Sequence, residues 1–381
     1  MFGQFLCCMS RVKTVDVDKS TSGQGIFPFE EASSTRFETG DTQSENVFIC
    51  MSKSGTKLGW VTPDRARIFE CSVGTDATED RCSVIRDFKL TSTDVVRHAQ
   101  VVEGSSPGST YLVILNLRAI TILDVATDVR SDVASPPDSG DITCGCQANN
   151  KLPDNPVVAA GTSAGDILLY NIKGELARKF KVSGAVSCIG SDNYYIYVGI
   201  GNRVEIFSMM SVTPTKVDVL ELPQDPFGQV GSSILRPVVR LIDRRPSSPV
   251  LSPEKGPKPV GSLFVVNKDK NCLAHVNLEL RQIVTESIIM DSIEQLVFGP
   301  FDNGPVISAS HRCMAAWESG AFLRMSSKLK KSIVSIAVSQ SREKPRIWAL
   351  SKHDNGQWEL SSLALRSGSY GSPKSARVGC L

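Results

Sequence analysis

The chain has 381 residues, 41% of them hydrophobic and 22% charged, which is typical of a globular protein with one large domain or two ordinary ones. Its 42 Lys and Arg residues nearly balance its 40 Asp and Glu residues, leaving a formal net charge of +2. This balance excludes a global field that would recruit nucleic acid or a membrane, so any electrostatic recognition must be local.

Residues 1–45 predict one short strand and a flexible connection. The segment VKTVDV (12–17) alternates like a strand, whereas residues 18–45 are rich in Ser, Thr, Gly and acidic groups. Near the start, Cys7 and Cys8 are adjacent and precede Arg11. The pair is either a site of S-acylation, which would tether the protein peripherally to a membrane, or two incidental thiols.

Residues 46–365 repeat one pattern seven times. The clearest copy begins at Pro156, where an apolar run leads through a Gly-rich turn into an alternating strand, and a second turn at Lys173-Gly174 leads to the outer strand ELARKFKV. This pattern predicts a unit of four antiparallel strands. No apolar run approaches the roughly 18 residues that are needed to span a bilayer.

One landmark recurs in all seven units, the apolar residue that closes the third strand. The landmark residues are Phe69, Leu123, Tyr170, Phe207, Val276, Trp317 and Leu363, and the 294 residues between the first and the last give a mean period of 49. Four-stranded repeats of about 40–50 residues are the signature of propeller blades. The sequence therefore predicts an all-β, seven-bladed β-propeller.

A propeller must be closed, and the sequence suggests how. The seventh unit lacks a fourth strand, because residues 366–381 are polar, turn-like and read as a flexible tail. The strand at 12–17 has no blade of its own. We therefore expect it to complete the last blade as its outer strand.

This layout resembles the WD40-like family of seven-bladed propellers. The resemblance lies in the repeat length and in the ends of the third strands, where Trp317-Glu318, Tyr170-Asn171 and Leu123-Asp124 occupy the Trp-Asp position of the family. No unit has the Gly-His opening of the family, and Gly201 and His311 stand where its turn Asp is expected. The resemblance implies a scaffold or adaptor that binds other proteins.

The sequence shows no catalytic, cofactor or metal motif. The four His residues are spread along the chain, and Cys144 and Cys146 face one side of a single strand, as core residues do. The segment 351–358 is near the Asp-box of sialidase-like propellers, but it has one residue too many and occurs once. An Asn-Gly hairpin with a packing Trp explains it. We expect no enzyme activity and no cofactor.

The turns before the third strands carry cations in five units. These are Arg65, Arg118, Arg203, Lys270 and Arg312. In a propeller such turns gather on one face, so they predict a basic collar that the small net charge conceals. The alternative is that they are ordinary charged turn residues, neutralised by acids such as Asp64, Asp166 and Asp269.

The insertion 244–259, in the fifth unit, has the composition of a disordered loop. It contains Ser248-Pro249 and Ser252-Pro253, and the tail contains Ser372-Pro373, so Ser248, Ser252 and Ser372 are candidate sites for a proline-directed kinase. The alternative is that these residues stay unmodified. The 11 scattered Cys residues indicate reduced thiols, which favours a cytoplasmic protein, with the nucleus as the alternative compartment.

Three functions follow from these observations. The first is a non-catalytic platform for protein–protein interaction. The second is a binder of anionic ligands, such as phosphopeptides, nucleic acids or lipid head groups, at the basic collar. The third is a hydrolase of the sialidase or lactonase type, which a cluster of carboxylates and His in the central channel would favour.

Overall fold

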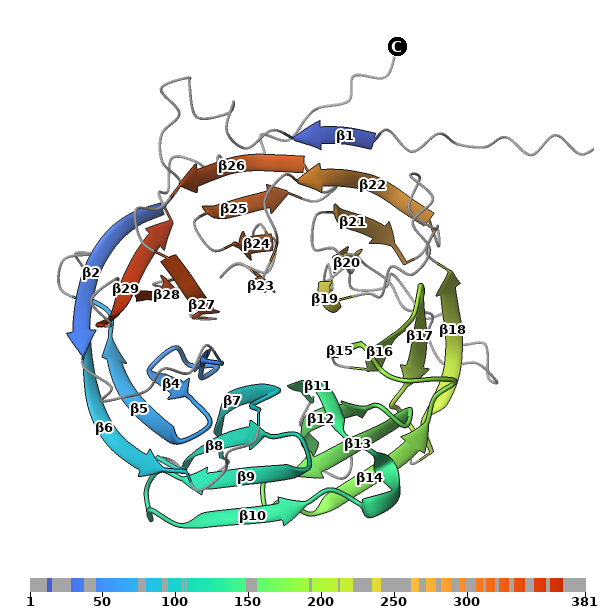
Figure 1. The fold of residues 1–381 in the computed structure, drawn as a ribbon, viewed down its shortest axis with the longest axis horizontal. Helices are drawn as coiled ribbons and strands as arrows, with labels where there is room; N and C mark the ends of the chain where they lie inside the picture. Colours follow the sequence, from blue (N-terminus) through green and yellow to red (C-terminus); the bar gives the residue numbers. More distant parts are fainter. Residues whose placement is uncertain are drawn as a thin grey trace, which may run out of the picture.

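Short antiparallel sheets form a ring around a central axis in this computed structural model, and strands account for nearly all of its regular structure (Figure 1). The structure describes residues 12–15, 29–37, 46–74, 80–90, 95–148 except 105 and 107, 156–221 except 192, 193 and 212, 235–240, 262–266, 272–278, 282–289, 293, 295–298, 306–310, 313–318, 322–328, 332–339, 346–353 and 357–365.

Six sheets in this part of the chain have the predicted four antiparallel strands. The first three are built from β3 (Phe48–Met51), β4 (Lys57–Val61), β5 (Arg65–Ser72) and β6 (Arg81–Lys89); β7 (His98–Glu103), β8 (Thr110–Leu115), β9 (Ala119–Asp124) and β10 (Arg130–Ala134); and β11 (Ile142–Gln147), β12 (Pro156–Thr162), β13 (Asp166–Asn171) and β14 (Leu176–Lys181). The other three are built from β15 (Cys188–Ser191), β16 (Tyr195–Ile200), β17 (Arg203–Ser208) and β18 (Thr215–Glu221); β23 (Gln295–Phe298), β24 (Val306–Ala309), β25 (Cys313–Glu318) and β26 (Phe322–Lys328); and β27 (Ser332–Val338), β28 (Arg346–Lys352), β29 (Trp358–Leu365) and β2 (Phe29–Phe37).

The sheet of the fifth unit has five strands instead of four. Its order is β1 (Val12–Val15), β22 (Gln282–Ile289), β21 (Cys272–Asn277), β20 (Ser262–Val266) and β19 (Leu235–Arg240), and β1 runs parallel to β22. The first strands of all the sheets adjoin one another in chain order, and β27 returns to β3 to complete the ring.

The landmark residues mark the same irregularity in nearly every unit. The pairing between the third and the outer strand shifts register beside Phe69, Tyr170, Phe207, Val276 and Trp317, and the pairing of β29 with β2 shifts beside Leu363. Such a shift is a β-bulge, which bends the outer strand and increases its twist. The periodic apolar residue thus sits where each outer strand turns away, and the predicted unit is confirmed.

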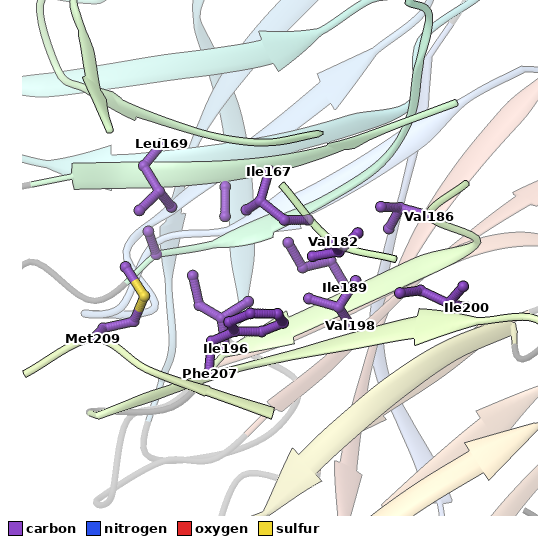
Figure 2. Close-up of a cluster of buried hydrophobic side chains, with 12 residues drawn as sticks. Ile167, Leu169, Val182, Val186, Ile189, Ile196, Val198, Ile200, Phe207 and Met209 are labelled. Atoms are coloured by element: carbon purple, nitrogen blue, oxygen red, sulfur yellow. The ribbon is translucent and has the colours of Figure 1, made fainter. Parts of the chain in front are cut away.

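The core lies between neighbouring sheets, which is why a single unit could not fold alone. Figure 2 shows one such layer, in which Ile167 and Leu169 of β13 face Ile196 and Val198 of β16 and Phe207 of β17. Similar layers separate the sheets on either side, including one between β4–β5 and β28–β29 that contains Trp60, Trp348 and Trp358.

The strand that completes the last sheet is β2, not the predicted segment 12–17. β2 pairs antiparallel with β29 from Phe29↔Leu365 to Phe37↔Trp358, whereas Val12–Val15 pairs with β22, two sheets away in the ring. The prediction that an N-terminal strand closes the ring is therefore confirmed, and its assignment to 12–17 is wrong. The prediction of a flexible connection over the whole of 18–45 is wrong for residues 29–37, which form β2. The assignment failed because alternation favours VKTVDV, whereas an outer strand needs no alternation to pair.

Polar contacts join the first sheet to the last. The Asp80 carboxylate, before β6, accepts hydrogen bonds from Arg346 Nε (2.6 Å) and Ser362 Oγ (2.6 Å). Nearer the axis, the Ile49 N–H donates to Ser335 Oγ at 3.1 Å. The Asp80 side chain is completely buried, so this ion pair is part of the boundary that closes the ring.

Candidate interaction surfaces

The turns of each sheet alternate between two faces of the ring. Because the strands are antiparallel and follow chain order, turns that enter the third strand lie at one end of every such sheet. We call this end the entry face, exemplified by residues 62–64 and 116–118. Turns that follow the first and third strands lie at the other end, the opposite face.

Three of the predicted collar cations are described, and all three lie on the entry face. Arg65 and Arg203 begin β5 and β17, and Arg118 precedes β9. Lys270 and Arg312 lie outside the described residues, as does Asp269. The structure thus brings the described members to one face of three sheets, as the repeat predicts.

Each of these cations has an acidic partner. Arg65 forms a two-point ion pair with Asp87 of β6, with distances of 2.6 Å from Nε and 2.5 Å from Nη2, and Arg67 Nε joins at 2.9 Å. Burial raises the pKa of Asp87, but the hydrogen bonds from Arg65 and Arg67 outweigh burial and hold that pKa below its ordinary value. The carboxylate therefore stays charged and offsets much of the local positive charge.

The neighbouring sheets repeat this pairing with different residues. Arg118, whose side chain is 76% exposed, meets Asp141 at 2.7 Å. Glu205 of β17 lies 3.0 Å from Lys216 and 3.7 Å from Arg203, and Ser183 donates a hydrogen bond to it. Burial raises the pKa of Glu205, but the bonds from Ser183 and Lys216 leave it lower than usual.

In the third sheet an acid begins the third strand, and its basic partners lie on the outer strand. Asp166 begins β13 and is almost completely buried, and the ammonium groups of Lys179 and Lys181 on β14 lie 3.6 and 3.4 Å from its oxygens. The entry face is therefore a row of acid–base pairs in the four sheets from β3 to β18. An anionic ligand there would compete with carboxylates that are already in place. Asp87 and Asp141 were not predicted as partners, because they are distant in sequence from the turns; Glu205, two residues after Arg203 on the same strand, was not predicted either.

The opposite face carries a different chemistry, which the sequence reasoning missed. Four large apolar side chains are exposed in its turns or at their edges, on three consecutive sheets: Val129 (59%), Leu176 (40%), Tyr194 (49%) and Met210 (53%). The only available signal was an apolar residue in a turn segment or at the first position of an outer strand, which periodicity does not register.

Three of these side chains lie at one boundary, between the sheets β11–β14 and β15–β18. The Met209 N–H donates to the Tyr194 carbonyl at 2.8 Å, which places Tyr194 beside Met210. Arg178, two residues beyond Leu176, donates from Nη1 to the Ser211 carbonyl at 2.8 Å. We call Leu176, Tyr194 and Met210 the apolar patch.

The turn that leads into Leu176 is held in place by its own hydrogen bonds. The Asn171 side-chain oxygen accepts from the N–H groups of Lys173 (2.9 Å) and Glu175 (3.0 Å), and Gly174 adopts a φ of 83° that favours glycine. Gly174 also lies against Val133 of the preceding sheet. Leu176 therefore projects from a turn with a defined backbone.

The remaining predicted sites divide into two groups. Cys144 and Cys146 both pack against the cluster of Figure 2, so the interpretation of this pair as core residues is confirmed. His275 stacks on Phe264 with ring centroids 4.9 Å apart. His353 accepts or donates a short hydrogen bond with Glu359. Cys7, Cys8, Ser248, Ser252, Ser372, the insertion 244–259 and the tail 366–381 lie outside the described residues.

The hairpin between β28 and β29 accounts for the segment that is near an Asp-box. The His353 N–H donates to the Gln357 carbonyl at 2.8 Å, and Trp358 is buried in the layer between the last sheet and the first. The interpretation of this segment as a hairpin with a packing Trp is confirmed.

Two features are absent from the part of the chain that the structure describes. No group of three or more His, Cys, Asp and Glu side chains gathers there as a metal site would require. Within the same part of the chain, no helix is both long and apolar enough to cross a membrane.

The chain matches no protein-family model and no curated protein. The assignment of the fold therefore depends on the ring of sheets alone. The likeness to WD40-like propellers remains a resemblance in repeat length and strand pattern.

Proposed function

We propose that the protein is a non-catalytic interaction platform, a scaffold or adaptor whose partner is another protein bound at the apolar patch. The observation that carries this proposal is the exposure of Leu176, Tyr194 and Met210 at one boundary between sheets. Burying an apolar side chain of this size from full exposure is worth roughly 1.5–3 kcal/mol. Because these residues are 40–53% exposed, a partner that covers them gains about half of that from each.

The chemistry of the patch favours a protein partner over an anionic ligand. Tyr and Met are both enriched in protein interfaces, and Tyr is a frequent hot-spot residue. The patch also includes polar backbone at its edge, since the Ser211 carbonyl receives Arg178. On the entry face, by contrast, each described collar cation is paired with an acid, which weakens the case for an anionic ligand there.

We also propose that the five-stranded sheet is a seventh blade. Its strands β19 to β22 follow chain order, and the shift beside Val276 falls where the other units have theirs. β1 is then an addition to the outside of a complete blade (Figure 1). A seven-bladed platform without cofactor or catalytic residues, resident in the cytoplasm or the nucleus, accounts for these features together with the reduced-thiol usage of the sequence.

The proposal is tested by affinity capture with two matched double variants. Leu176→Glu/Met210→Glu places two carboxylates in the patch, and Val84→Glu/Val95→Glu makes the same chemical change at two exposed Val residues elsewhere. Both variants should melt near the wild-type temperature, because exposed substitutions change stability little. A discrete set of proteins should be recovered at least tenfold less with the patch variant, a loss of about 1.4 kcal/mol, and undiminished with the control.

The result that would overturn the proposal is equal recovery of every partner with both variants. A loss shared by both variants would also count against the patch, because it would report charge in general and not this location.

A further inference from the structure

Two cysteines face each other across neighbouring strands of the first sheet. Cys71 of β5 and Cys82 of β6 are directly opposite in the register, and their Sγ atoms lie 2.8 Å apart. Among the cysteines whose side chains the structure describes, this is the one such pair: Cys144 and Cys146 share a strand, and the Cys50 thiol points to the Gly59 carbonyl.

The backbone shows that the pair has the right geometry for a covalent bond. The Cys71 N–H donates to the Thr56 carbonyl at 2.8 Å, on the side away from β6. In an antiparallel strand the N–H and C=O of one residue point to the same neighbour, so Cys71 and Cys82 form a non-hydrogen-bonded pair. Such pairs have Cα atoms about 4.5 Å apart, within the roughly 4.4–6.8 Å that disulfides span.

We propose that Cys71 and Cys82 are a redox modification site, which hydrogen peroxide converts reversibly from two thiols to a disulfide. This goes beyond a platform function and rests on none of the residues of the apolar patch.

The two thiols have different roles because their environments differ. Cys82 is partly exposed, whereas Cys71 is 4% exposed. The hydrogen bond with Cys82, and then burial, raise the pKa of Cys71, so its thiol is protonated at neutral pH. Cys82 therefore meets the oxidant, and Cys71 resolves the product.

The chemistry balances in two steps. The sulfur of Cys82 attacks one peroxide oxygen, the O–O bond breaks, and Cys82 becomes a sulfenic acid as one water leaves with the thiol proton. The sulfur of Cys71 then attacks the sulfenic sulfur, the S–O bond breaks, and the hydroxyl leaves with the Cys71 proton as a second water. The two thiols lose two electrons, and peroxide gains them. Two molecules of a low-molecular-weight thiol such as glutathione reverse the change and leave as their own disulfide.

The disulfide would stabilise the boundary between the first and the last sheet, where the ring closes. Cys82 follows Asp80 by two residues, and the Asp80 carboxylate holds Arg346 and Ser362 of the last sheet. Joining Cys82 to Cys71 closes a loop over residues 71–82 and fixes the segment that carries Asp80. A loop of about this length should raise the melting temperature of the oxidised protein by roughly 3–5 °C.

The test uses tryptic digestion of the full chain, because Arg81 separates the two cysteines. Cleavage after Arg67, Arg81 and Arg86 yields peptides 68–81 and 82–86, with one of the two cysteines in each. The protein is treated with hydrogen peroxide, alkylated and digested without reductant. We expect one linked species whose mass is the sum of the two peptides less two hydrogens, and dithiothreitol should release both.

Three variants make the result specific. Cys82→Ser, at a partly exposed position, should abolish both the linked species and the rise in melting temperature, and Cys71→Ala should do the same. Cys144→Ser, which alters the pair that shares a strand, should leave both unchanged. If peroxide-treated wild type shows both cysteines alkylated, Cys82 driven to sulfinic acid, or Cys82 linked to another cysteine, the proposal is wrong.

Discussion

Replacing Asp80 should weaken the protein more than replacing any exposed acid, because Asp80 joins the first sheet to the last. Its carboxylate accepts from Arg346 at 2.6 Å, from Ser362 at 2.6 Å and from the Gly74 N–H at 3.1 Å. The Asp80 side chain is fully buried and that of Arg346 is 10% exposed. Asp80→Ala would therefore leave a guanidinium without its carboxylate in a site that water barely reaches.

The cost of removing one partner of a buried ion pair is about 3–5 kcal/mol. Unfolding entropy for a ring of this size converts that cost into a fall of roughly 4–7 °C in melting temperature. Urea unfolding followed by tryptophan fluorescence measures the free energy directly, since Trp60, Trp348 and Trp358 all lie in the layer between these two sheets.

Two comparisons isolate the effect. Asp141→Ala removes the partner of Arg118, an exposed pair, and should cost less than about 1 kcal/mol. Asp80→Ala/Arg346→Met removes both buried charges and should recover part of the loss of the single variant. If Asp80→Ala costs no more than Asp141→Ala, the buried pair does not hold the ring closed and the reasoning fails.

Two further predictions concern the N-terminal strands and an acid on the entry face. A variant lacking residues 1–37 loses β2 and exposes the edge of β29, so it should melt at a lower temperature or aggregate. A variant lacking residues 1–17 loses β1 alone and should melt near the wild-type temperature. Equal melting temperatures for the two variants would count against β2 as the closing strand. Because the folded pKa of Glu205 lies below its usual value of 4.5, its contribution to stability is complete above that value and is lost as the pH falls through the folded pKa. The stability difference between wild type and Glu205→Gln, measured by urea unfolding, should therefore shrink with acidification below about pH 4.5; a difference independent of pH would refute this.

The repeating unit could be predicted from the sequence because the spacing of apolar residues reflects which positions are buried between sheets. Residues such as Phe69 and Tyr170 lie between two sheets and are almost completely buried, so the chain must supply an apolar side chain there in each repeat. The bulge beside them could not be predicted, because it depends on how the outer strand pairs and not on which residue occupies the position.

Outer strands are the elements that periodicity identifies worst. They have one sheet neighbour and much of their surface in water, so their residues need not alternate. β10 and β6 show burial patterns with few buried residues, and β2 has the polar sequence FEEASSTRF. A strand of this kind is recognised by its partner, which in this case lies more than 300 residues away.

The interaction surfaces could likewise be predicted only in part. Turn position predicted which face Arg65, Arg118 and Arg203 would share, because that follows from the order of strands. The pairing of Arg65 with Asp87 depends on the register between β5 and β6, and that of Arg118 with Asp141 on how neighbouring sheets approach each other. Glu205 lies two residues after Arg203 on the same strand. The apolar patch required knowledge of which turn residues have no neighbour to cover them, and that is a property of the assembled ring.

The pairing of β2 with β29 determines when the ring can close during synthesis. β2 is translated before its partner, because residue 358, at the start of β29, follows residue 37 by 321 positions. At about 5–20 residues per second, β2 waits roughly 15–60 s for that partner. During this interval the sheets in between can fold one upon another, while the first and the last remain apart. The ring can therefore close only after residues 358–365 have been made and β2 has paired with them.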